Sequence, residues 1–186
     1  MADVRSKGAN FHGLLSAIER VHGEELRARV TAAVPGEAGD ALRLGGVVTG
    51  GWYPIAWHDA LLAATEGCLP GRRLAIRELT YAAVKHDFQT LFKVVSLVAS
   101  PSFALTNSSK VMARYYEGGR VSVVESRDEY VHLRFDDYFG FTPRLWDDVH
   151  GGLEAIVDLM GVVRQPFEVR HAHGPRAEFV VRYKRA

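Results

Sequence analysis

The chain has a single cysteine, almost no net charge and no long hydrophobic run, and each of these excludes a class of protein. One thiol, Cys68, cannot form an internal disulfide or a zinc site built on several thiolates. Lys and Arg number 23 against 22 Asp and Glu, so no overall field attracts nucleic acid or an anionic membrane. The most apolar run, LFKVVSLVAS, is too short and too polar to span a bilayer, and the first residues lack the apolar core of a signal peptide. We therefore expect a cytoplasmic protein.

The sequence also lacks the common catalytic motifs. It contains no G-x-S-x-G elbow, no phosphate-binding P-loop and no G-x-G-x-x-G after an expected strand. We therefore predict no catalytic residue and favour a non-enzymatic protein. The alternative is an enzyme that acts on a small hydrophobic substrate with His58 or His150 as the acid–base group.

The composition is that of one globular domain of ordinary size. The 186 residues are 47% hydrophobic and 24% charged, enough to bury a core without disulfides or metals. We expect a single domain over residues 1–186. Its parts are a flexible N-terminus over residues 1–9, a mainly helical part over 10–117 and a hairpin–helix–hairpin part over 118–186.

Apolar side chains recur at helical spacing through most of the first two thirds of the chain. The stretches NFHGLLSAIERVHG and GEELRARVTAAVPG each predict a helix, and the glycine-rich residues 36–53 predict a loop. A third helix begins at Pro54, which suits a first helical position. A long helix over about residues 72–99 follows, and a further helix then ends at the glycines of YYEGG.

The last third changes to alternating apolar and polar residues. RVSVVES and EYVHLRF predict one hairpin around the turn RDE, and VRQPFEVRH and RAEFVVRYK predict a second. The helix between them has Thr142 as its N-cap and Pro143 as its first residue. Inside this helix, Gly151 and Gly152 predict the close approach of another backbone or of a ligand. These elements predict an α+β fold, with helices packed on one face of a four-stranded antiparallel sheet made of two hairpins.

The order of these elements resembles a known family. The stretches that carry the resemblance are FHGLLSAI, YPIAWHDALLAA, RELTYAAVKHDFQTL, SSKVMARYYEGG and GGLEAIVDLMG. They span about residues 10–184 and resemble an uncharacterised family of about-200-residue proteins abundant in myxobacteria. That family is in turn similar to the TRAPP-like superfamily, which includes vesicle-tethering subunits, vinyl-reductase-type domains and haem-NO-binding-associated domains.

The resemblance implies a bacterial α+β protein, a homodimer formed through helices, and an apolar tunnel for a lipid or other small molecule. A zinc role is not implied, because the cysteine cluster of the metal-binding relatives is absent. The function that follows is a regulatory or scaffold domain that dimerises and binds a partner protein or an apolar small molecule. Fold-level analogy of this kind does not itself transfer function.

Aromatic residues supply the ligand-binding candidates. These are Trp57, Phe88 and Tyr115, with His58 as the polar group that would orient a ligand in an apolar pocket. The other interpretation, which we favour from the sequence, makes Trp57 a core anchor that docks its helix and His58 a border residue half in water.

No metal site is predicted. His171 and His173 point the same way on an extended strand, but two ligands do not make a zinc site. The acidic residues Asp136, Asp137, Asp147 and Asp148 have oxygens that could hold a divalent cation. The helix dipole is the better explanation, because Asp147 and Asp148 lie in or near a first helical turn, where negative charge is favoured. We predict no cofactor, and a haem held by His86 or His150, or a lipid-like ligand, is the alternative.

The C-terminal hairpin is locally basic. Arg134, Arg170, Arg182 and Lys184 can share one open sheet face and form a patch for a phosphate-bearing partner. We favour a solvated sheet face, since the rest of the chain cancels this charge. Nucleic-acid binding through this patch is therefore only an alternative.

Overall fold

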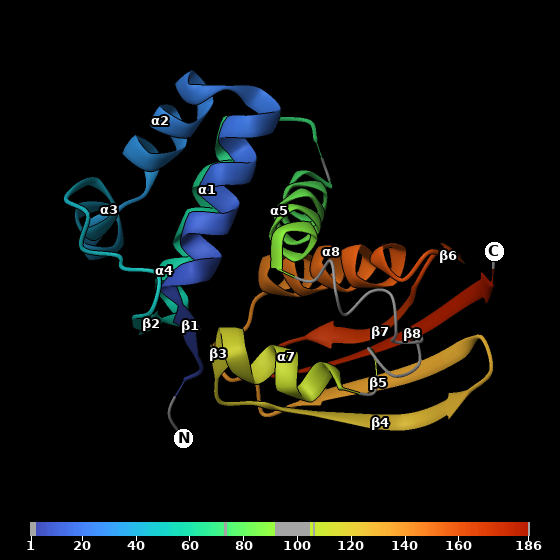
Figure 1. The fold of residues 1–186 in the computed structure, drawn as a ribbon. Coiled ribbons are helices and arrows are strands. Elements are labelled where there is room, and N and C mark those ends of the chain that lie inside the picture. Colours follow the sequence, from blue (N-terminus) through green and yellow to red (C-terminus); the bar gives the residue numbers. More distant parts are fainter. Residues whose placement is uncertain (1–2, 73, 92–104, 106, 186) are drawn as a thin grey trace.

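The N-terminal helices form a group at one end of the protein. The computed structural model describes residues 3–72, 74–91, 105 and 107–185. The group contains α1 (Gly8–His22), α2 (Glu24–Ala33), α3 (Gly36–Arg43) and α4 (Ile55–Cys68). Figure 1 shows α1 and α4 standing together, with α2 and α3 on their outer side. The helices bury one apolar face each, and their fully buried side chains include Phe11, Ile18, Leu61 and Leu62.

The second part of the fold is an antiparallel sheet. Its strands run in the order β4 (Arg120–Arg127), β5 (Tyr130–Asp136), β8 (Arg176–Arg185) and β6 (Val162–Arg164), and β7 (Glu168–His173) also pairs with β8. The two predicted hairpins are β4–β5 and β7–β8, and they join where β5 pairs with β8. The α+β fold class is thus confirmed, and β6 is an addition that the alternating pattern did not reveal.

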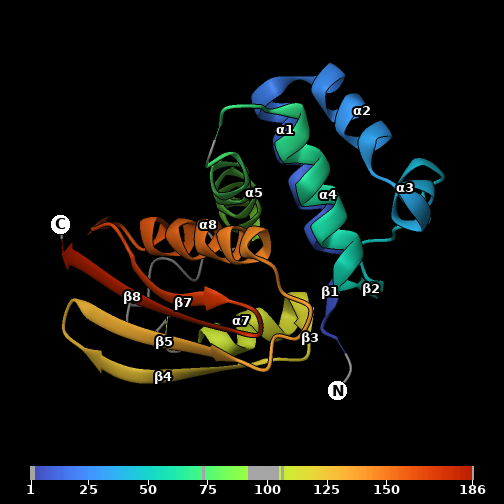
Figure 2. The same cartoon turned by 180° about the vertical axis from the view of Figure 1, so that it is seen from behind.

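Within the described ranges, three further helices accompany this sheet. They are α5 (Ala75–Leu91), α7 (Ser108–Tyr115) and α8 (Pro143–Leu159). Figure 2 shows α8 between the sheet and α5. Beneath α8, the aromatic rings of Phe135, Trp146 and Phe179 pack edge to face or tilted at 5.4–6.5 Å. Helix α5 joins the two parts, because it packs against both α8 and α1.

The crossing of α5 and α8 depends on Gly151, one of the two adjacent glycines of α8. A Cβ atom at Gly151 would lie 2.2 Å from the backbone oxygen of Arg77 on α5. No side chain fits there, so the helices approach backbone to backbone, as the glycine pair predicted. The predicted long helix is described only as far as Leu91, and its remaining residues lie outside the described part of the chain.

A small second sheet differs from the expectations for the N-terminus. Strand β1 (Arg5–Lys7) pairs with β2 (Trp52–Pro54) on one side and with β3 (Tyr116–Glu117) on the other. Residues 5–9, expected to be flexible, therefore form a strand and the first turn of α1. Ser6 is fully buried in this sheet. Pairing with two distant segments overrides the weak local signal of the sequence.

The stretch 36–53, expected to be a loop, contains α3 and most of β2. Gly39 explains why a glycine-rich segment forms a helix here. A Cβ at this position would lie 2.0 Å from the oxygen of Val34, so only glycine allows the turn to close so tightly. None of the described helices is both long enough and apolar enough to cross a bilayer.

Polar side chains tie the N-terminal helices to the start of α8. Thr142 donates a hydrogen bond of 2.5 Å to Asp59 on α4, and Arg144 donates to both carboxylate oxygens of Asp59 at 3.0 and 3.2 Å. Arg144 also lies 3.5 Å from Glu66. The same Thr142 hydroxyl accepts from the backbone of Leu145, which confirms it as the N-cap.

A candidate ligand pocket

A cavity of about 90 Å³ lies where α1, α5, α7 and α8 meet. Its walls are mostly apolar and include Leu14, Val84, Met112, Val149 and Ile156. Part of the space exists because two of the wall residues are glycines. The nearest atoms to a Cβ added at Gly13 or Gly152 would be 3.6–4.0 Å away, so these positions have room that no side chain fills.

Asp148 is the most buried charged group of the pocket wall. Its exposed fraction is 7%. Thr80 on α5 donates to one carboxylate oxygen at 2.6 Å, and Tyr116 on β3 donates to the other at 2.7 Å. Burial and the nearby Asp148 charge raise the pKa of Tyr116 well above its usual value, so its hydroxyl keeps the proton that it donates. Three segments far apart in the sequence therefore form one polar group at the wall.

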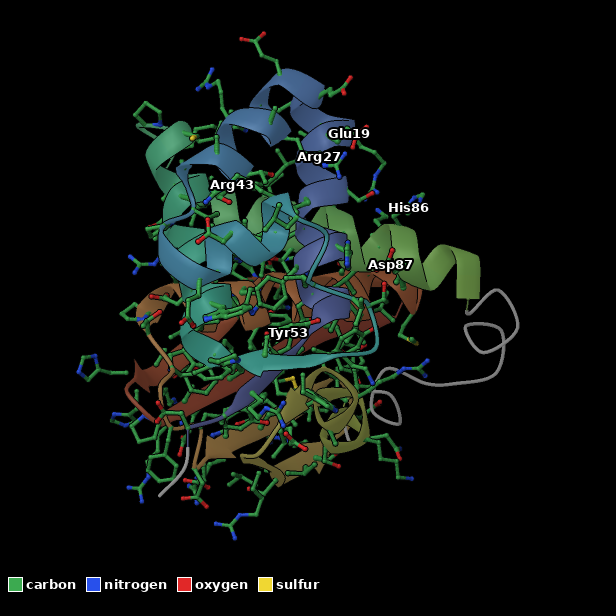
Figure 3. The ribbon with its side chains drawn as sticks, turned by 90° about the vertical axis from the view of Figure 1, so that its left-hand side faces the viewer. Glu19, Arg27, Arg43, Tyr53, His86 and Asp87 are labelled. Atoms are coloured by element: carbon green, nitrogen blue, oxygen red, sulfur yellow. The ribbon has the colours of Figure 1, made fainter. Side chains whose placement is uncertain are left out.

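Asp87 is the second carboxylate of the pocket wall. It lies on α5 beside α1, next to His86, as Figure 3 shows. Burial raises its pKa, and electrostatic interactions with His86 and Arg20 act in the opposite direction. Tyr115, also in the wall, has its pKa raised by burial and by Asp87. Both groups therefore favour their neutral forms more than they would in water.

His58 lies behind the pocket wall and not in it. Its side chain is fully buried, and its ring stacks near Tyr116 at 6.4 Å. Nδ1 shares a hydrogen bond of 3.2 Å with Ser6, whose hydroxyl also accepts from Asn10 in the pocket wall. Nε2 has no hydrogen-bond partner among the described residues. Burial lowers the pKa of His58, so the ring is neutral, and the expectation that it is half in water is wrong.

The predicted ligand-binding residues with described side chains lie in different places. Of the four, Tyr115 lines the pocket. Trp57 is half-buried and stacks on Tyr53 at 5.7 Å, an arrangement that fits helix docking. The side chain of Phe88 lies outside the described part of the chain.

Sequence analysis missed Asp148, Thr80 and Tyr116. Asp148 was interpreted as a first-turn residue, but α8 begins at Pro143 and its first turn holds no acidic residue. A usable signal was present, because Asp148 follows Leu145 by three positions and so lies on the buried face of the helix. Nothing in the spacing of the sequence linked it to Thr80 or Tyr116.

The arginines of the predicted basic sheet face form ion pairs with glutamates. Arg134 contacts Glu178 at 2.8 Å, while Arg170 and Arg182 both contact Glu168, at 2.6 and 3.2 Å. These carboxylates offset the charge that a phosphate group would need. Lys184 is exposed. Within the described ranges, no three His, Cys, Asp or Glu side chains lie close enough together to hold a metal ion.

No protein-family model and no curated protein matches the sequence, whereas solved structures match the fold. An H-NOX protein from K. algicida, solved as Fe(II) unliganded, is 14% identical with a TM-score of 0.72, and 97% of each chain is covered. An H-NOX protein from S. oneidensis in the Fe(II)NO state is 12% identical with a TM-score of 0.71, covering 96% of this chain and 99% of that one. An oxygen-binding H-NOX domain related to soluble guanylate cyclases is 11% identical with a TM-score of 0.68, covering 96% of this chain and 95% of that one.

These neighbours show that the chain has the fold of H-NOX domains. This is a likeness of fold alone, and only as such does it agree with the predicted resemblance to haem-NO-binding-associated domains. The finer assignments, including the myxobacterial family, the homodimer and the cytoplasmic location, stay predictions.

The expectation of no cofactor is contradicted by the same comparison. The similar solved proteins are described with Fe(II), with NO or with oxygen, and one further neighbour is described by its haem redox potential and porphyrin distortion. A bound group therefore has to be considered for this chain as well.

The pocket residues do not fit a histidine-ligated haem. All eight histidines of the chain lie in its described part, and none of them lines the pocket. His86 is exposed on α5, and His150 stacks on Phe167 at 5.3 Å, away from the pocket wall. The other residue types that bind haem iron are represented in the wall by Met112, Tyr115 and Tyr116, and the Tyr116 hydroxyl already donates to Asp148. The cavity is also smaller than the ~150 Å³ that holds one benzene molecule.

Proposed function

We propose that this chain is a non-enzymatic regulatory domain that binds a small molecule in the pocket between α1, α5, α7 and α8. The observation that carries the proposal is the pocket itself, with apolar walls and a few converging polar groups. Ligand sites in proteins have this composition. The likeness to H-NOX domains supports it, because those proteins are described with small ligands bound.

The position of the pocket also suits a regulatory role. Its walls come from α1 of the N-terminal helices and from α5, α7 and α8 beside the sheet. A ligand there contacts both parts of the fold and can favour one arrangement of them over another. No observation favours the enzyme alternative, since neither His58 nor His150 lines the pocket. The ion-paired sheet face likewise gives no support to a nucleic-acid binder.

Native mass spectrometry of the protein purified from its own host tests the proposal. We expect a reproducible extra mass, and the same spectrum reports whether the predicted homodimer forms. Gly152→Leu places a side chain in the pocket and should remove the extra mass. Gly67→Leu is the matched control, because a Cβ at that helical glycine meets nothing within 4 Å.

A clean ligand-free wild-type protein would contradict the proposal, and so would equal retention of the mass by both variants. Circular dichroism should establish first that the variants are folded. An extra mass equal to that of haem, with a Soret band in the absorption spectrum, would show that the pocket opens to admit a group that its present residues do not fit.

A further inference from the structure

We propose that the pocket selects a small apolar molecule that carries a positively charged amine, and that the amine binds Asp148. This inference rests on the proposed function and names the ligand class of the same site. It starts from the charges of the pocket wall. The wall contains two carboxylates, Asp87 and Asp148, and none of its described residues is a Lys, an Arg or a His.

Asp148 is buried, and no Lys, Arg or His among the described residues forms an ion pair with it. Its two hydrogen-bond partners, Thr80 and Tyr116, are neutral hydroxyl donors, and each occupies one acceptor site on one oxygen. None of the ion pairs among the described residues includes Asp148. With only these two donors among the described residues, the remaining lone pairs of Asp148 can accept from a ligand. Buried charges in proteins are normally paired, so the cavity beside this carboxylate is where a cation would be stabilised.

Glu154, two turns further along α8, provides an internal comparison. Its exposed fraction is 5%, close to that of Asp148. Arg77 and Arg164 both donate hydrogen bonds to Glu154. The same helix thus carries two equally buried carboxylates, one with two guanidinium partners from the protein and one that faces an open cavity. The difference indicates that no described side chain is the partner of Asp148, and we infer that a ligand supplies it.

His58 does not supply the missing charge. It is close enough to Asp148 for their charges to interact, but burial lowers its pKa more than Asp148 raises it. The ring is neutral at physiological pH and points its hydrogen-bonded nitrogen at Ser6.

The cavity volume limits the apolar part of the ligand. About 90 Å³ accommodates a short alkyl group, or the end of a longer molecule. Anionic molecules are disfavoured, because their carboxylates would meet Asp148, which has no basic partner among the described residues. This excludes fatty acids and also opposes the propionate groups of a haem.

Three probes of similar size and different charge test the inference on the full chain. They are n-butylamine, n-butanol and butyrate, titrated at neutral pH while ¹H–¹⁵N spectra are recorded. We expect shifts at the backbone amides of Thr80, Tyr116 and Gly152. The amine should bind about tenfold more tightly than the alcohol, the ratio that one charged hydrogen bond provides, and butyrate should bind most weakly.

Asp148→Asn keeps the shape of the side chain and removes its charge. In this variant the preference for the amine over the alcohol should disappear. Asp40→Asn is the matched control, because it removes an exposed carboxylate on α3 and should leave the preference unchanged. If Asp148→Asn does not fold, the comparison of the three probes on the wild-type protein still decides the question.

The outcomes separate the two proposals. If no probe shifts the pocket amides, the pocket does not bind small molecules and the proposed function is overturned. If the alcohol or butyrate binds as tightly as the amine, or if Asp148→Asn keeps the preference, the pocket stands and the amine assignment is overturned.

Discussion

His150 has an environment that makes its charged form unfavourable. Its exposed fraction is 6%, and its ring lies nearly parallel to that of Phe167, at 8° and 5.3 Å. Burial lowers its pKa to about 4, and the neighbouring Arg77 acts in the same direction. Nε2 has no hydrogen-bond partner among the described residues, although Glu154 lies 3.7 Å away. The folded protein therefore holds this imidazole in its neutral form.

This burial predicts a loss of stability in mild acid. Below pH 6.5 the unfolded chain takes up a proton at His150, whereas the folded protein does so only near pH 4, so stability falls as the pH falls through this window. The loss attributable to His150 is on the order of 2–3 kcal/mol. Urea unfolding of the wild type and of His150→Phe at several pH values measures it. The Phe variant keeps a stacked ring and should lose less stability, and equal losses would refute the assignment.

The two adjacent glycines of α8 have different roles. Gly151 faces the backbone of α5, where an added Cβ would lie 2.2 Å from the oxygen of Arg77. Gly152 faces the pocket, where the nearest atom, on Val84, would be 3.7 Å away. One position is closed by a helix crossing, and its neighbour is open to a cavity.

Alanine substitutions at these two positions should change stability in opposite directions. Gly152→Ala should stabilise the protein by about 0.5–1 kcal/mol, because it restricts the unfolded chain and fits the available space. Gly151→Ala should destabilise it by about 1–3 kcal/mol, because α5 and α8 must move apart. Chemical denaturation gives both values. Changes of the same sign in both variants would contradict this packing of α5 on α8.

Much at the level of single elements could be predicted from the sequence. Thr142 and Pro143 set the start of α8 through local geometry alone. The alternation of apolar and polar residues predicted both hairpins. The helix at Gly36–Arg43 and strand β1 were missed, because each depends on contacts that local patterns do not encode. The pocket was missed for the same reason. Asp148, Thr80 and Tyr116 come from three elements, and only the folded chain brings their side chains together.

Across the whole molecule, Asp59 provides a polar connection between the N-terminal helices and α8. It accepts hydrogen bonds from Thr142 and from Nε and Nη2 of Arg144, and the pKa of Arg144 is raised chiefly by this contact. The paired groups are only partly exposed, at 35% for Arg144 and 19% for Asp59. Such a bidentate pair contributes more than an ordinary surface ion pair.

Arg144→Ala should therefore loosen the contact between the two parts of the fold. We expect a stability loss of about 1–2 kcal/mol and faster hydrogen exchange in α4 and in the first turns of α8. Arg120→Ala is the matched control, because its ion pair with Asp137 is exposed at 70% and 51% and should contribute about 0–1 kcal/mol. If the two variants have identical hydrogen-exchange rates in α4, Asp59 does not connect the two parts of the fold.

The position of β1 has a consequence for how the protein is made. This strand lies between β2 and β3, and its Arg5 contacts Glu117, which is 112 residues further along the chain. A ribosome adds about 5–20 residues each second, so β1 is synthesised roughly 6–20 seconds before its second partner. Val4 and Ser6, both buried in the finished protein, cannot be covered completely until that second partner exists. The small sheet is therefore completed late in translation.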